Sequence, residues 1–138
     1  MNNINKLKYL GENGVCVYED GSQYSGYWKS GKRNGLGSYI FANKDEYHGK
    51  WVGDKRCGWG KLQTIEKYNN SYEGIWYNNV PHGEGIMHYT DNTYYSGEFK
   101  NGKRHGYGKL IQLEDDYMLT DEIILSEGEW REDIFGRL

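Results

Sequence analysis

Aromatic and small residues alternate with polar residues in four segments of the chain, with the two-residue period of a β-strand. Each segment carries the motif Tyr-x-Gly-x-Trp or Tyr-x-Gly-x-Phe, and the motifs start at Tyr24, Tyr47, Tyr72 and Tyr95. Because side chains two residues apart point to the same side of a strand, the three motif residues share one face. The central glycine disfavours a helix. The pattern therefore predicts four strands, each with one aromatic face.

A two-residue turn signal follows each motif, and a Gly-x-Gly pair follows each turn. The turn pairs are Ser30-Gly31, Gly53-Asp54, Asn78-Asn79 and Asn101-Gly102. Such pairs favour tight hairpin turns with positive φ, so the Gly-x-Gly segment should return as the antiparallel neighbour of the motif. Opposed residues of a hairpin share a face. The expected pairs in the first hairpin are Trp28 with Arg33, Gly26 with Gly35, and Tyr24 with Gly37.

The whole unit recurs at a nearly constant spacing. Successive motifs start 23, 25 and 23 residues apart, and a return-turn signal such as Asp20-Gly21 or Asp91-Asn92 precedes each of them. A period of this length indicates a stacked array of small units. Tight turns at both ends of each strand make that array a meander. The predicted fold class is all-β: an open, single-layer antiparallel meander of about ten strands, elongated, with an aromatic trough along one face.

With 138 residues the chain has the length of one domain. We predict a half repeat at 12–23, repeats at 24–46, 47–71, 72–94 and 95–125, and a partial repeat at 126–138. The fourth repeat contains an acidic and apolar insertion near 113–125. The fourth repeat holds eight more residues than the first and third repeats, and an even number of extra residues favours a longer hairpin, with a short capping helix as the alternative. We expect the insertion to protect the C-terminal end of the sheet and the N-terminal edge near 12–18 to stay open.

The recurring positions, Tyr-x-Gly-x-Trp/Phe-x-x-Gly-x-x-x-Gly-x-Gly, resemble the MORN (membrane occupation and recognition nexus) repeat. The resemblance covers about residues 12–136. Copies two and three depart from the pattern with Asp54 and Asn79 at the first turn glycine, and the fifth copy has Ser126 in place of tyrosine. Asp54 and Asn79 are themselves turn residues, so the expected fold is unchanged.

This resemblance implies an elongated scaffold without catalytic activity. Related repeats occur in cytoskeletal organisers, ciliary radial spokes and membrane junctions, and as appendages of lipid kinases. Some hold a partner helix in the aromatic trough, and some have been proposed to bind phosphoinositides. By this resemblance we expect a protein partner in a larger cytoskeletal or ciliary assembly, and a cytoplasmic location.

Composition and motifs narrow the function further. The net charge of −3 does not favour a nucleic acid as partner. Phosphate-binding loops and nucleophile elbows are absent from the sequence, so we expect no enzyme activity, no cofactor and no small-molecule substrate. Cys57, His82 and His105 hold equivalent positions, but these lie two strands apart, roughly 9.6 Å, which is too far for one metal ion. Without a signal-like apolar start, the thiols are expected to be reduced.

The first candidate site is the predicted aromatic face. Rings on a one-layer sheet should stay partly exposed, and an exposed apolar face marks a partner site. The alternative is that the rings stack on one another and replace a core. The predicted partner-binding residues are Tyr24, Trp28, Tyr47, Trp51, Tyr72, Trp76, Tyr95, Phe99 and Trp130.

The second candidate site consists of three basic pairs at one position of the repeat. They are Lys32-Arg33, Lys55-Arg56 and Lys103-Arg104. Each arginine is expected to stack on the ring opposite it, namely Trp28, Trp51 and Phe99. The pairs could form a strip that binds anionic phospholipids, which makes a peripheral membrane adaptor the alternative function. They could equally be a solvated edge that discourages pairing between sheets.

Overall fold

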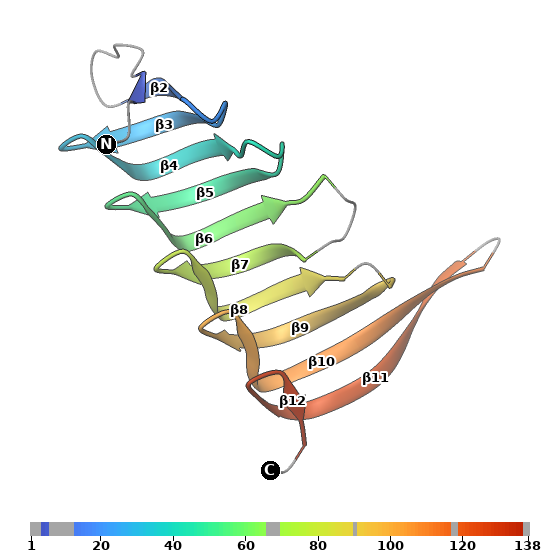
Figure 1. Ribbon diagram of the computed structural model, residues 1–138. Helices are drawn as coiled ribbons and strands as arrows, with labels where there is room; N and C mark the ends of the chain where they lie inside the picture. Colours follow the sequence, from blue (N-terminus) through green and yellow to red (C-terminus); the bar gives the residue numbers. More distant parts are fainter. Residues whose placement is uncertain (1–3, 6–12, 66–69, 90, 117–118, 137–138) are drawn as a thin grey trace.

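The computed structural model describes residues 4–5, 13–65, 70–89, 91–116 and 119–136 of the chain. These residues form one antiparallel sheet of twelve strands in sequence order, with no second layer (Figure 1). The strands are β1 (Ile4–Asn5), β2 (Asn13–Tyr18), β3 (Gln23–Lys29), β4 (Lys32–Ile40), β5 (Glu46–Val52), β6 (Lys55–Gln63), β7 (Ser71–Tyr77), β8 (Val80–His88), β9 (Thr93–Lys100), β10 (Lys103–Asp116), β11 (Leu119–Arg131) and β12 (Ile134–Phe135). The predicted open meander is confirmed. The sheet has two strands more than the ten expected, namely the two-residue strands β1 and β12.

The predicted hairpin turns are confirmed at all four positions. Both central residues of each turn have positive φ, for example 51° at Ser30 and 77° at Gly31. Asparagine and aspartate tolerate this region, which explains why Asp54 and Asn79 replace glycine there, with φ of 69° and 72°. These turns lie along one side of the sheet and the return turns along the other (Figure 1).

The register within each hairpin differs from the prediction beyond the first pairs. Trp28 faces Arg33 as expected, but Gly26 faces Gly37 and Tyr24 faces Tyr39. The cause is a bulge in which Tyr27 lies opposite residues 34–36, with Gly35 at φ +94°. The ring of Tyr24 lies over Gly37, where a Cβ would overlap the phenol oxygen. The shift recurs in repeats two to four, where Gly49, Gly74 and Gly97 face Gly60, Gly85 and Gly108.

The insertion forms the longer hairpin, and the alternative of a capping helix is wrong. Strands β10 and β11 extend beyond their neighbours and pair from Gly106–Trp130 to Asp116–Leu119. A bulge at Leu125 interrupts the pairing, since Leu110 faces Ser126 and Ile111 faces Ile124. A bulge twists the strand locally and is a common device at sheet edges.

The two ends of the sheet each carry a two-residue strand. At the N-terminal end, β1 pairs with Val17 and Tyr18 of β2, so part of the edge that we expected to be open is covered. At the C-terminal end, β12 pairs with Trp130 and Arg131 of β11. Between these ends the core lies on one face of the sheet only, where Cys16 and the nine motif rings are buried.

Candidate partner-binding face

The motif rings form a continuous ladder from repeat to repeat. The ring of Tyr47 lies 5.2 Å from Trp51 of its own repeat and 5.4 Å from Trp76 of the next, at interplanar angles of 84° and 88°. Tyr24, Tyr72 and Tyr95 make the same two edge-to-face contacts. Each such pair contributes about 0.5–1.5 kcal/mol beyond the area that it buries. The ladder therefore couples every motif to its neighbour.

Hydrogen bonds fix the rings of the ladder. The hydroxyl of each motif tyrosine donates to the backbone carbonyl three residues later, for instance from Tyr47 to Lys50 O over 2.9 Å. The indole N–H groups of Trp28, Trp76 and Trp130 donate to glycine carbonyl groups over 3.0–3.2 Å. Trp51 differs, because its buried indole nitrogen has no hydrogen-bond partner among the described residues. Burial raises the pKa of Tyr24 to about 12 and raises the pKa of Tyr47 further.

The expectation that these rings stay partly exposed is wrong. All nine are buried, from 0% exposure for Tyr24, Tyr47 and Tyr95 to 8% for Trp28. The rings stack on one another closely enough to replace the second layer that most sheets need. They serve as the core of the protein, so any surface offered to a partner comes from other residues.

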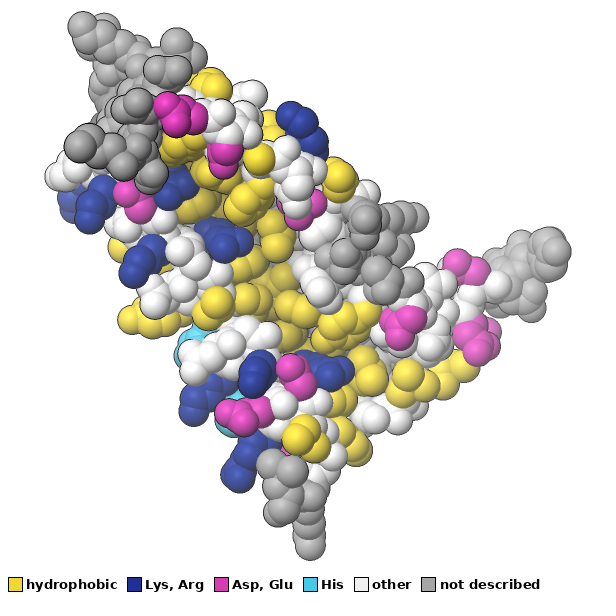
Figure 2. Space-filling model, in the orientation of Figure 1, with side chains coloured by type: hydrophobic (Ala, Val, Ile, Leu, Met, Phe, Trp, Pro, Cys, Tyr) yellow, Lys and Arg dark blue, Asp and Glu magenta, His cyan; other side chains and the backbone are white. Residues whose placement is uncertain are grey.

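A second row of apolar side chains lies over this core, and the sequence analysis did not identify it. Tyr39, Leu62, Met87 and Leu110 each stand two residues after a Gly-x-Gly pair, and Tyr18, Phe41 and Tyr89 lie beside them. All seven are half-buried and pack against the ring ladder. With the rings they form a continuous hydrophobic band along the hollowed face of the molecule (Figure 2). We call these seven residues the second row.

The three arginines of the basic pairs turn onto this face, but not onto the expected rings. Each guanidinium lies over the tryptophan of the following repeat. Arg33 Cζ is 4.6 Å from the centroid of Trp51, and Arg56 Cζ is 4.7 Å from that of Trp76. Arg104 Cζ is likewise 4.6 Å from Trp130. These contacts link repeats, and the prediction that each arginine stacks on the Trp or Phe opposite it in its hairpin is wrong. Arg33 Cζ also lies 5.2 Å from the ring of Tyr39 in its own hairpin.

A turn residue of the following repeat also binds each arginine. Asp54 Oδ1 accepts from the backbone N–H of Arg33 over 2.8 Å and from its Nε over 3.1 Å. Asp133 binds Arg104 in the same way, and Asn79 holds the corresponding place beside Arg56. The third repeat has Pro81 in place of the arginine. This junction keeps the backbone hydrogen bond, from Gly102 N–H to Pro81 O, but a proline has no guanidinium to bind the turn residue. Junctions between repeats thus share one geometry but differ in charge.

Comparison with known families agrees with this repeating geometry. The family model described as "MORN repeat" matches residues 24–46, 47–64, 72–94 and 95–111, which is more than half of the chain. The protein belongs to the MORN-repeat family. A search of curated proteins found no match to the chain.

The lysines of the MORN-repeat turns remain at the surface. Lys32, Lys55 and Lys103 are exposed along the side where the hairpin turns lie, and Figure 2 shows basic side chains gathered there. The predicted basic strip is thus divided, because its lysines face solvent while its arginines lie over the ring ladder. The six residues that we named as one lipid site do not share one surface.

The opposite face of the sheet, which we call the back face, carries exposed apolar residues. Leu36, Trp59 and Tyr107 stand between the two glycines of their Gly-x-Gly pairs and are 65%, 57% and 49% exposed. Tyr27 is exposed beside Leu36, and Lys50 faces Leu36 across the strands. Sequence analysis overlooked this set, although the middle residue of the Gly-x-Gly pair is apolar in three of four repeats.

The described residues also form hollows on the surface. A hollow of about 410 Å³ opens over the second row and is lined by Asp20, Phe41, Ala42, Asn43, Asp45, Arg56 and Leu62. Among the described residues, no cluster of three or more His, Cys, Asp or Glu side chains is placed to hold a metal ion. The same residues include no helix with the length and apolar character needed to span a membrane.

Proposed function

We propose that this MORN-repeat protein is a non-catalytic scaffold that holds a helical or extended segment of a partner protein along its trough. One observation carries the proposal. The second row continues across the array, half-buried, over a ring core that is already complete without it. A continuous apolar band on a water-soluble surface is typical of a protein interaction site. Tyrosine, methionine and other adaptable side chains are enriched in such sites.

The buried rings contribute to this function indirectly. They form a rigid floor, while the exposed atoms of Tyr39, Phe41, Leu62, Met87 and Tyr89 would contact the partner. A rigid apolar surface loses little conformational entropy on binding, which favours affinity. This assignment replaces direct contact by the nine motif rings as the proposed mode of binding.

The proposed setting of the protein rests on family resemblance alone. MORN repeats occur in scaffold and membrane-binding proteins. On that ground we propose a cytoplasmic subunit of a larger cytoskeletal or ciliary assembly, whose partner is a protein rather than a nucleic acid or a small molecule. The net charge of −3 is consistent with the exclusion of nucleic acid.

Site-specific photo-cross-linking tests the scaffold proposal. A photoreactive phenylalanine analogue replaces Leu62 in the trough, and the matched control carries it at Trp59 on the back face. We expect a defined set of cellular proteins to cross-link from position 62 and not from position 59. Met87→Glu, which places a charge in the second row, should remove those cross-links while circular dichroism shows an intact sheet. Equal cross-linking from both positions would refute docking in the trough.

A second candidate, a peripheral membrane adaptor, is favoured by the lysine side of the sheet. Lys32, Lys55 and Lys103 are exposed there, and the exposed rings of Tyr27 and Trp59 lie on the adjoining back face. Lysines contribute about 1 kcal/mol each near an anionic membrane, and aromatic rings partition into its interface. The arginines are excluded from this set because they stack on the ring ladder.

Liposome sedimentation tests the membrane candidate. At low salt we expect the protein to sediment with vesicles of phosphatidylserine and phosphatidylcholine but not with phosphatidylcholine alone. The triple variant Lys32→Glu, Lys55→Glu, Lys103→Glu should stay in the supernatant. Failure of the wild-type protein to sediment with the anionic vesicles would end this candidate and leave the scaffold proposal intact.

A further inference from the structure

The three stacked arginines provide an internal comparison. Arg33, Arg56 and Arg104 are all half-buried on the trough side, and their guanidinium groups lie at the same height over the next tryptophan, 4.6–4.7 Å from its centroid. The turn residues behind them also match, since Asp54, Asn79 and Asp133 donate a backbone N–H to the arginine carbonyl over 3.0–3.1 Å. Any difference between the three therefore arises from side-chain chemistry and not from the backbone.

Two of the three guanidinium charges are neutralised within the fold. Arg33 Nε lies 3.1 Å from Asp54 Oδ1, and one terminal nitrogen of Arg33 donates to Asp54 O over 3.2 Å. Arg104 makes both contacts with Asp133, each over 3.2 Å. Charge-assisted hydrogen bonds of this kind are roughly twice as strong as neutral ones.

Arg56 lacks this neutralisation. Its partner is the amide of Asn79, whose Oδ1 accepts from Arg56 N over 2.9 Å and only weakly from Nε over 3.4 Å. Within the described residues, no carboxylate lies within 4.0 Å of Arg56, and its terminal nitrogens donate no hydrogen bond. Burial lowers the pKa of Arg56, which reflects the cost of holding an uncompensated charge there. A ligand that supplies a negative charge would recover that cost.

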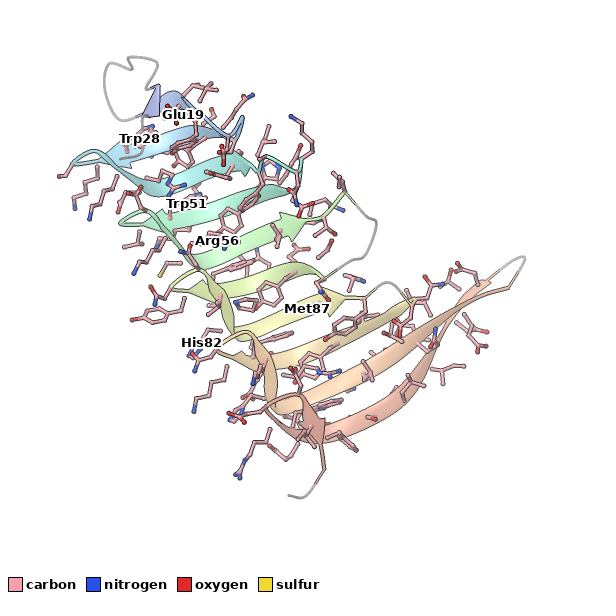
Figure 3. The ribbon with its side chains drawn as sticks, in the orientation of Figure 1. Glu19, Trp28, Trp51, Arg56, His82 and Met87 are labelled. Atoms are coloured by element: carbon pink, nitrogen blue, oxygen red, sulfur yellow. The ribbon has the colours of Figure 1, made fainter. Side chains whose placement is uncertain are left out.

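Arg56 is also the arginine that lines the hollow over the second row. Its guanidinium carbon is 5.7 Å from the ring of Phe41, and Leu62 forms another apolar wall. Figure 3 shows Arg56 midway along the array, between Trp51 and Met87. The hollow therefore combines apolar walls with an arginine that no carboxylate of the described residues contacts.

We propose that Arg56 binds a carboxylate, namely an Asp or Glu side chain of the partner segment that occupies the trough. This inference rests on the proposed scaffold function and adds the chemistry of one contact. The guanidinium presents two parallel N–H donors that match a carboxylate. The apolar walls suit the methylene groups that carry such a carboxylate.

The rim of the hollow favours a carboxylate over a phosphate. Asp20 and Asp45 line it. Asp20 Oδ1 accepts from the backbone N–H and the hydroxyl of Ser22. Asp45 Oδ2 accepts from Asn43 Nδ2, and Asp45 Oδ1 accepts from Ile65 N. Hydrogen bonds from Ser22 lower the pKa of Asp20, so this rim residue is ionised at neutral pH. An ionised carboxylate on the rim repels a dianion more strongly than a monoanion. We therefore expect inorganic phosphate to bind more weakly than a single carboxylate.

A small aromatic acid tests the contact without the partner. Phenylacetate carries one carboxylate next to an apolar ring, and phenylacetamide is its neutral match. In NMR titrations of the full chain, phenylacetate should saturably shift the Arg56 Nε–H and Trp76 indole resonances. We expect phenylacetate to bind at least about fivefold more tightly than phenylacetamide, as charged hydrogen bonds exceed neutral ones by about 1 kcal/mol. Inorganic phosphate is the third ligand tested.

Exchanging the turn residues supplies matched variants. Asn79→Asp should neutralise Arg56 as Asp54 neutralises Arg33, and should abolish phenylacetate binding while leaving the fold intact. Asp54→Asn should free Arg33 and create a second site, reported by the indole resonance of Trp51. Arg56→Gln should also abolish binding, but it removes the stack on Trp76, so Asn79→Asp is the decisive variant.

Three results would overturn the proposal. They are equal affinity for phenylacetate and phenylacetamide, tighter binding of inorganic phosphate, and retained phenylacetate binding in folded Asn79→Asp. The outcome is distinguishable from failure of the scaffold function. If phenylacetate binds at Arg56 but no partner cross-links from position 62, the carboxylate site stands and trough docking fails. If the partner cross-links but phenylacetate does not bind, docking in the trough stands and the carboxylate site at Arg56 fails.

Discussion

The two faces of this single sheet are built by opposite rules. On the trough side, each repeat places a tyrosine and a tryptophan or phenylalanine at the same points, and these rings are buried to 8% exposure or less. On the back face, the position between the paired glycines holds Leu36, Trp59, Glu84 and Tyr107 in turn, and all four are exposed. Uniformity across repeats marks the core here, because each ring must fit both its own repeat and the next.

A ring ladder of this kind makes the stability of the protein depend on one face. Each ring between the ends of the ladder touches one ring of its own repeat and one ring of an adjacent repeat. One substitution therefore disturbs both the packing within a repeat and a junction between repeats. Back-face residues lack such contacts with a core. Substitutions and solution conditions should therefore affect the two faces very unequally, and the four predictions that follow are ordered by the size of the expected effect.

Alkaline pH should have the largest effect. Burial raises the pKa of Tyr24 from 10.0 to about 12 and raises the pKa values of Tyr47, Tyr72 and Tyr95 further. Below pH 10 both states keep these protons and stability is full. Above pH 10 the unfolded state releases protons that the folded state retains, so the free energy of unfolding falls as pH rises. Urea denaturation between pH 8 and 12 should show this decline. Ionisation of all tyrosines near pH 10, with the sheet still folded, would contradict it.

Truncation of a ladder ring should come next. Trp76→Ala removes edge-to-face contacts with Tyr47 and Tyr72, the stack under Arg56 and a hydrogen bond to Gly60 O. Removing a buried aromatic ring typically costs about 3–5 kcal/mol, a large part of the stability of a domain. Thermal and urea unfolding measure the loss. A cost below about 1 kcal/mol would show that the ladder is not the core.

A smaller loss is expected where a glycine makes room for a ring. In Gly60→Ala the new Cβ would overlap the phenol ring of Tyr47. Overpacking of this kind costs about 1–3 kcal/mol. The matched control is Lys61→Ala, at the next position of β6, whose side chain is half exposed on the back face. Urea unfolding should separate the two variants, and equal midpoints would argue against close packing of ring on glycine.

The sequence predicted the strands, the hairpin turns and the rings of the ladder, because each depends on residues that repeat. It did not predict the register beyond Trp28. Residues 34–36 lie in a bulge opposite Tyr27, and of these three only Gly35 belongs to the repeat motif, so the motif does not signal the bulge. The ring on which each arginine stacks was also predicted wrongly, although its cross-strand partner was correct. Their stacking partner belongs to the following repeat, and the contact depends on how repeats stack rather than on the hairpin itself.

The candidate surface was the least predictable part. Tyr39, Leu62, Met87 and Leu110 share only apolar character at one repeat position, and so they escaped a search for identical residues. Their half-buried state becomes visible only once the ring ladder fills the space beneath them. The sequence equally hid that Arg56 faces the amide of Asn79 instead of a carboxylate, because this contact joins residues 23 apart in the sequence.

The smallest effect is expected on the back face. Trp59→Ala removes a side chain as large as that of Trp76, but 57% of Trp59 is exposed and its cross-strand neighbour is Ile75. Surface substitutions away from buried contacts usually change stability by no more than about 0.5 kcal/mol. The midpoint of urea unfolding for this variant should therefore stay close to that of the wild-type protein. A loss comparable to that of Trp76→Ala would mean that both faces support the sheet, and the contrast between the two faces would have to be abandoned.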